Sequence, residues 1–232
     1  MTTNTSRFFR QAYCLFALVF AGFIAISSAH ADDKRDFFRA VEMDRPDLVE
    51  KLLKKGVDPN VTEPYKGNTG LIIAMHEGAM GVFNLLVNTP GIDLNKRADN
   101  GNTAIMLAAW KSNVPAVKTL LEKGAQVNQT GWTALHYAAA VGNEEIVKML
   151  LDKKADVNAL APNKTTPLMM AARGGHIRMV KTLLDHGADV RLRNEWDMNA
   201  IDFARDNDHA NIEKGLQSRL DKIEAMSTMK QQ

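Results

Sequence analysis

Beyond residue 31, the side chains that could carry chemistry are chiefly histidines, namely His76, His136, His176, His186 and His209. His76-Glu77 comes closest to a metal-binding phrase, but a helical zinc site needs a second histidine one turn later, and none follows. Gly-x-Ser-x-Gly and phosphate-cradling glycine loops are also missing from the sequence. The pattern favours structural hydrogen bonding by these histidines. We expect no enzymatic activity, no metal and no cofactor.

The same part of the chain is rich in methionine, which raises the alternative of a Met/His-based metal or redox role. Met106, Met149, Met169 and Met179 fall at helical positions where apolar side chains pack. A flexible thioether fills irregular gaps in a core. Core packing is therefore the preferred interpretation of the methionines, and the metal or redox role remains a second alternative.

Composition limits the class of protein. The chain has 232 residues, 29 Lys+Arg against 27 Asp+Glu, and is 45% hydrophobic. Such a chain folds into a core instead of remaining disordered. The nearly balanced charge disfavours a nucleic-acid binder, which normally carries a basic excess.

The first 31 residues have a composition of their own. Arg7 and Arg10 precede an apolar stretch over 12–26, and Ala29-His-Ala31 follows. A basic start, a short apolar region and an Ala-x-Ala site are typical of a secretory signal peptide cleaved after Ala31. A retained N-terminal anchor is the alternative, although the stretch is shorter than the roughly 20 residues that span a bilayer. Cleavage would also remove the single cysteine, Cys14.

The rest of the chain contains a repeated phrase. Its first part occurs as Thr103-Ala-Ile-Met-Leu-Ala-Ala109, Thr133-Ala-Leu-His-Tyr-Ala-Ala139 and Thr166-Pro-Leu-Met-Met-Ala-Ala172. A second part occurs as Val117-Lys-Thr-Leu-Leu121, Val147-Lys-Met-Leu-Leu151 and Val180-Lys-Thr-Leu-Leu184. A third part closes each copy as Gly124-Ala-Gln-Val-Asn128, Ala155-Asp-Val-Asn158 or Gly187-Ala-Asp-Val190. A phrase of about 33 residues that recurs along a chain indicates a stacked repeat architecture.

The phrase resembles the ankyrin repeat over nearly the whole chain after residue 31. The resemblance implies an all-α solenoid of helix-turn-helix units joined by β-turn fingers, with about six repeats including atypical caps. The units lie near 34–61, 66–95, 99–128, 130–158, 162–190 and 195–222, within a domain over 32–226 that a frayed tail, 227–232, follows. His136 matches the family's Thr-Pro-Leu-His position, and His176 and His209 match its Gly-His turn, where such side chains make structural hydrogen bonds.

The residues account physically for such a unit. Thr69, Thr103, Thr133, Thr166 and Asn199 are N-cap residue types placed before an apolar helical run. Paired alanines in the first helix permit close helix packing. Glycines after the second helix favour a left-handed helix end. Because only four residues separate Asn128 from Thr133, the finger between the third and fourth units is expected to be short.

Aromatic side chains indicate the candidate binding face. Phe37, Phe38, Phe83, Tyr137 and Phe203 fit apolar helical positions and are expected in the core. Trp110 ends a first helix on the side that the family turns toward its concave groove, whereas Tyr65, Trp132 and Trp196 lie in fingers. Tryptophan is enriched at binding hot spots. We expect partner binding by Trp110, Trp132, Tyr65, Lys111, Arg173, Trp196 and His76, with packing in the short finger as the alternative for Trp132.

Together, these features predict a monomeric, non-enzymatic, periplasmic module that binds another protein through its concave face and fingers. We expect it to bind neither nucleic acid nor, after cleavage, a membrane. A secreted effector that binds a host protein is the first alternative function.

Overall fold

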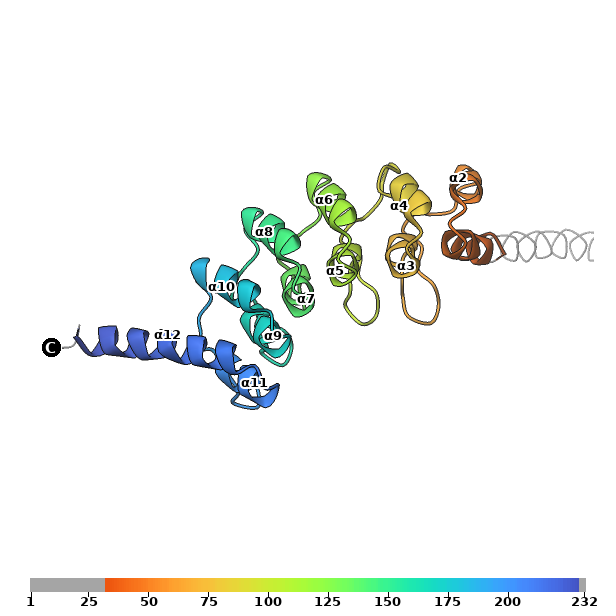
Figure 1. The fold of residues 1–232 in the computed structure, drawn as a ribbon. Helices are drawn as coiled ribbons and strands as arrows, with labels where there is room; N and C mark the ends of the chain where they lie inside the picture. The colour runs from red at the N-terminus through yellow and green to blue at the C-terminus, as the bar shows by residue number, and fades with distance from the viewer. Residues whose placement is uncertain (1–31, 230–232) are drawn as a thin grey trace, which may run out of the picture.

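The structure is a computed structural model that describes residues 32–229. The expected signal peptide, its cleavage site after Ala31 and Cys14 lie outside the described residues. Helices stand side by side in a row of helix-turn-helix pairs, which is the expected all-helical solenoid (Figure 1). Within residues 32–229 the only β pairing is an isolated bridge between Thr62 and Thr69.

The helices form two layers (Figure 1). The inner layer contains a helix over 32–42 and then α3 (Gly70–Glu77), α5 (Ala104–Trp110), α7 (Ala134–Val141), α9 (Pro167–Arg173) and α11 (Ala200–Asp206). The outer layer contains α2 (Pro46–Lys54), α4 (Met80–Leu86), α6 (Val114–Glu122), α8 (Glu144–Asp152) and α10 (Ile177–Asp185). The final helix, α12 (Ala210–Met229), packs on α11. Each unit buries its apolar faces against its neighbours, so one core runs along the stack.

The expected N-caps form at most of the inner helices. Thr69 accepts a hydrogen bond from the Ile72 amide, Thr166 accepts one from Met169, and Asn199 accepts bonds from two amides. Thr133 and Thr103 are the exceptions: the Thr133 hydroxyl bonds to His136 Nδ1, and the buried Oγ1 of Thr103 has no hydrogen-bond partner among residues 32–229. The extended backbone of Thr103 occupies the N-cap position, but its side chain does not cap α5.

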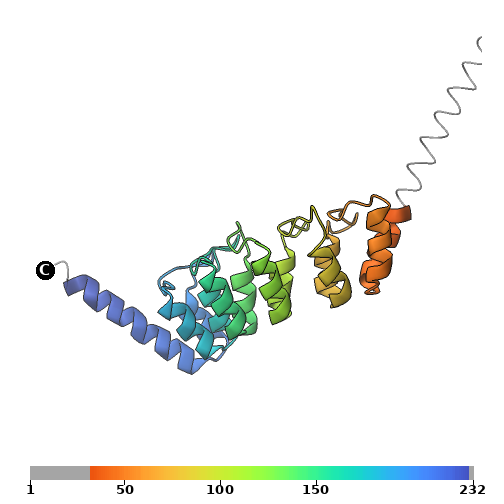
Figure 2. The ribbon, with the colours of Figure 1, turned by 90° about the horizontal axis from the view of Figure 1, so that it is seen from above.

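The C-terminal helix is longer than the sequence analysis expected. Residues 227–229, which were expected to fray, continue α12 in helical conformation. Ile212 and Leu216 are buried, whereas the later part of α12 projects beyond the stack (Figure 2). No glycine or proline follows Gly215, so the helix has no local stop signal before residue 229. No helix within 32–229 is both long and apolar enough to cross a membrane.

Packing between neighbouring inner helices is uneven. The contact between α3 and α5 is smaller than the contacts that α7 makes with α5 and α9, and the two views show the wider spacing (Figures 1 and 2). Buried Met75 of α3 stands where α5, α7 and α9 carry Ala109, Ala139 and Ala172. A methionine needs more room than an alanine in a close-packed interior, so we infer that Met75 contributes to the wider spacing.

Candidate functional site

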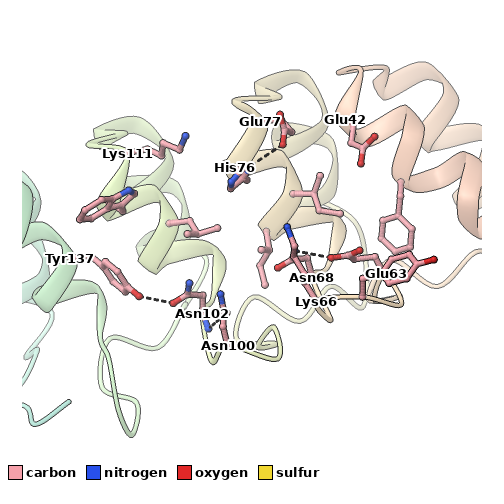
Figure 3. A pocket seen from close by; sticks show the side chains of 16 residues that line it. Glu42, Glu63, Lys66, Asn68, His76, Glu77, Asn100, Asn102, Lys111 and Tyr137 are labelled. Atoms are coloured by element: carbon pink, nitrogen blue, oxygen red, sulfur yellow. Dashed lines mark hydrogen bonds and ion pairs between the residues drawn. The ribbon is translucent and has the colours of Figure 1, made fainter. Parts of the chain in front are cut away.

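A groove of about 670 Å³ lies where α3 and α5 stand apart. Its walls come from four successive units: the helix over 32–42, the finger over 63–68, α3, the finger residues 100 and 102, α5, and Tyr137 of α7 (Figure 3). Ile72, Ile73 and Leu107 form an apolar floor, and polar side chains line the edges. The combination of an apolar floor with a polar rim is typical of binding sites.

The groove gathers four of the seven expected binding residues, namely Tyr65, His76, Trp110 and Lys111. Tyr65 is 88% exposed and Trp110 is 49% exposed, so both present aromatic surface to solvent. His76 Nδ1 lies 2.8 Å from Glu77 Oε1 at the end of α3. These side chains come from a finger and from two helices that are far apart in the sequence, and the repeat stack brings them together.

Tyr137 packs against the core, as the sequence analysis expected, but its exposed side also lines this groove. Its ring meets that of Trp110 edge-on, with centroids 5.9 Å apart and planes at 78°. Its hydroxyl donates a 2.7 Å hydrogen bond to Asn102 Oδ1, which fixes the ring across the third and fourth units. Partial burial raises the pKa of Tyr137, while the Asn102 bond opposes that rise. Trp110 is therefore held by a positioned, protonated tyrosine.

Trp132 packs beside Tyr137. It is half-buried, with its ring 5.2 Å from that of His136 and 6.3 Å from that of Tyr137. This is the packing arrangement that was the alternative for Trp132 in the short finger. Contact between Trp132 and a partner stays a prediction.

Arg173 and Trp196 do not line the groove. Arg173 occupies the position in α9 that Trp110 occupies in α5, and its side chain is exposed. Trp196 is 64% exposed in the finger before α11. Both lie in later units than the groove, so the seven expected residues do not form one compact site.

The histidines of the later units make structural hydrogen bonds. His136 is fully buried, with Nδ1 against Thr133 and Nε2 2.9 Å from the Thr165 carbonyl oxygen. Burial lowers the pKa of His136 to about 4, so the ring is neutral at pH 7. His176 and His209 each bridge back to an inner-helix carbonyl, at Ala140 and Arg173. The roles expected for these three residues are confirmed.

Comparison with known proteins identifies the repeat. A family model described as "Ankyrin repeats (3 copies)" matches residues 37–130, 82–161, 126–194 and 155–223, which together cover most of the chain. The chain belongs to the ankyrin-repeat family. Ankyrin repeats are generally protein–protein interaction modules.

Relatives share a segment of this repeat array. The human photoreceptor ankyrin repeat protein is 37% identical over 78 residues, covering 33% of this chain and 17% of the relative. Human transient receptor potential cation channel subfamily A member 1 is 33% identical over 91 residues, covering 38% and 8%. Human SH3 and multiple ankyrin repeat domains protein 2 is 41% identical over 78 residues, covering 33% and 4%. The aligned segments thus span less than a fifth of these relatives.

The ankyrin core contains the methionines that raised the metal alternative. Met106, Met169 and Met179 are each 1% exposed and pack among apolar side chains. Within residues 32–229 no group of three or more His, Cys, Asp or Glu side chains is placed to hold a metal ion. These three thioethers pack in the core, and Met149 is partly buried against it.

Several polar groove residues were not predicted from the sequence, among them two glutamates. Glu42 ends the first inner helix, and Glu63 lies in the first finger. The first ankyrin unit lacks the Thr phrase, so Glu42 could not be aligned with the helix ends of later units. Glu63 is two residues before Tyr65, and this proximity was the available signal.

Proposed function

We propose that this ankyrin-repeat protein is a non-enzymatic, monomeric binding module that engages a partner protein through the groove around Trp110. One observation is the main support for this proposal: the exposed Tyr65 and Trp110 line the same groove as His76 and Lys111. A pre-positioned aromatic anchor loses little conformational freedom on binding.

The arrangement of Trp110 supports this proposal. Its ring contacts Tyr137, which is itself held by Asn102, yet about half of its surface remains exposed. Exposed tryptophan held in a fixed orientation has the features of a binding hot spot. Among residues 32–229, none of the aromatic ring pairs includes Trp196.

Site-specific photo-crosslinking in intact cells tests this function. A photoreactive amino acid replaces Tyr65 in one variant and Trp196 in a control variant, because both positions are finger residues with exposed side chains. We expect a protein adduct at position 65 that is lost on Trp110→Ala. Equal adducts at both positions, or an adduct at position 65 that persists without Trp110, would contradict the groove as the binding site.

We further propose that the protein is exported to the periplasm of a bacterium by the N-terminal segment and cleaved after Ala31. The support is the basic start, the apolar stretch and the Ala29-His-Ala31 site. Cell fractionation followed by N-terminal sequencing tests this. A mature protein that starts at Asp32 in the periplasmic fraction is expected, whereas a cytoplasmic protein that still starts at Met1 would refute it. Recovery from the medium would instead favour the secreted effector.

A further inference from the structure

The N-terminal half of the groove carries more acidic than basic side chains. Glu42, Glu63 and Glu77 come from the first inner helix, the first finger and α3. The ion pairs that Lys and Arg make with glutamates within 32–229 involve Glu50, Glu144 and Glu213, and none of these lines the groove. Glu77 Oε1 lies 2.8 Å from His76 Nδ1, and Glu63 accepts a bond from the Asn68 side-chain amide.

The basic side chains of the groove are fewer. Lys111 stands on the α5 side, away from Glu42 and Glu63 (Figure 3). Lys66 lies in the same finger as Glu63 but forms no ion pair with it. The side of the groove formed by the first unit, the first finger and α3 therefore carries three glutamates against one lysine, whereas the α5 edge carries Lys111. A bound segment must match this order of charge.

Apolar and aromatic surface lies beside the carboxylates. Ile73 and Leu107 form part of the floor, Phe38 is half-buried on the first inner helix, and Tyr65 is almost fully exposed. An aromatic ring beside carboxylates suits a guanidinium or ammonium group, because the ring face attracts cations. The floor suits an aliphatic side chain.

We propose that the groove binds an extended partner segment in which an aliphatic residue is flanked by Lys or Arg. The aliphatic side chain lies on Ile73 and Leu107, and the cation lies among Glu42, Glu63 and Glu77 beside Tyr65. The groove crosses four units, which fits an extended chain better than a compact ligand. This inference rests on the proposed binding function and adds the chemistry of the partner.

Selection from a phage-displayed random peptide library tests the inference, with the full chain as bait. We expect selected peptides that combine Leu, Ile or Val with neighbouring Lys or Arg, and that no longer bind the Trp110→Ala variant. The Glu42→Gln/Glu63→Gln/Glu77→Gln variant should bind such a peptide about fivefold more weakly, as expected for the loss of solvent-exposed ion pairs. The matched control, Glu122→Gln/Glu145→Gln/Asp152→Asn, removes the same charge from outer helices and should change the affinity less than twofold.

A second measurement keeps the test independent of how the variants fold. The selected peptide with Gln in place of its Lys or Arg is titrated against the unmodified protein, and we expect the same fivefold loss. Peptides that need Trp110 but carry no basic excess would overturn this inference and leave the proposed function intact. If no selected peptide depends on Trp110, the groove is not the binding site, and both proposals fail.

Discussion

The boundary between the second and third units and the boundary between the fourth and fifth units are built from the same repeat but are closed to different degrees. At the later boundary, α7 and α9 pack closely and carry the buried Ala139 and Ala172, and His176 bonds to the Ala140 carbonyl. At the earlier boundary, α3 carries Met75, makes a smaller contact with α5, and a groove opens between them. A few substitutions in a repeat thus decide whether a boundary is closed or open.

The later boundary also has more of the asparagine and histidine hydrogen bonds that link neighbouring units than the earlier boundary. Asn158 bonds to both the Gly187 carbonyl and the Asp189 amide, whereas Asn95 accepts only the Gln126 amide. His136 ties the fourth unit to the Thr165 carbonyl, but Ile72 stands at the equivalent position in the second unit. We therefore expect the later units to be the more stable part and the earlier units to be the more adaptable part.

The largest effect is expected from exchanging the residues that distinguish the two boundaries. Met75→Ala should lower the free energy of unfolding by about 2 to 5 kcal/mol, since it removes a buried side chain. Ala139→Met should cost about 1 to 3 kcal/mol by overpacking a closed boundary. Urea unfolding measures both changes.

Spin labels on the exposed residues His76 and Lys111 show whether Met75 sets the spacing. Met75→Ala should shorten the distance between the labels, because α3 can then approach α5. An unchanged distance would mean that Met75 does not hold the groove open.

Two glycines with nearly the same backbone conformation allow the two boundaries to be compared by substitution. Gly78 and Gly142 both end an inner helix in the left-handed region, with φ of 74° and 75°. A Cβ at Gly78 meets no heavy atom within 4 Å, whereas one at Gly142 would lie 2.5 Å from His176 Nδ1. Gly78→Ala should therefore cost about 1 kcal/mol of strain. Gly142→Ala should cost about 2 to 3 kcal/mol, because it also displaces the hydrogen-bonded His176.

Thermal or urea unfolding of variants that also carry His176→Ala isolates the contribution of the His176 ring to the cost of Gly142→Ala. There the cost of Gly142→Ala should fall to that of Gly78→Ala, because the clashing ring is gone. If Gly142→Ala remains the more costly change without the ring, His176 is not the reason for the difference between the boundaries.

Acid should weaken the later boundary selectively. The pKa of buried His136 is about 4 in the folded protein and 6.5 in the unfolded chain, so the unfolded state takes up the proton first. The stability from neutral His136 is complete above pH 6.5 and is lost as the pH falls toward 4. This linkage predicts a loss of about 2 kcal/mol between pH 7 and pH 5. Urea unfolding of His136→Gln should show a correspondingly smaller difference between these pH values, and an identical difference in both proteins would exclude His136 as the titrating group.

The sequence predicted the closed boundaries better than the open one. Thr133, Thr166 and the alanine pairs are local signals, so the helices and their stacking follow from residue types at regular spacing. Trp110 and Tyr65 were recognised because the repeat alignment places them at the end of an inner helix and in a finger. The groove itself depends on how far α3 stands from α5, which is a property of packing.

Tyr137 illustrates the same limit. Its position in α7 corresponds to Leu107 in α5 and Met170 in α9, so its sequence pattern is that of an apolar packing residue. All three positions are half-buried along the concave side, and only the contacts with Trp110 and Asn102 assign Tyr137 to the site. Whether a half-buried residue of this kind belongs to the core or to a binding site can be decided only from the three-dimensional structure.

The smallest effect is expected from the asparagines that link successive units. Asn158 donates to the Gly187 carbonyl at 3.2 Å and accepts from the Asp189 amide at 2.8 Å, whereas Asn95 accepts from the Gln126 amide alone. Asn158→Ala should cost about 1 kcal/mol and Asn95→Ala about half of that, because each hydrogen bond near the surface contributes little net stability.

Amide hydrogen exchange resolves this difference residue by residue. Asn158→Ala should speed exchange at the Asp189 amide, and Asn95→Ala should speed it at the Gln126 amide, since each amide loses its acceptor. If Asn95→Ala costs as much as Asn158→Ala, these links do not distinguish the two boundaries. The difference must then arise from the packing of the inner helices, because Met75 and the alanine pairs would be the remaining distinction between an open boundary and a closed one.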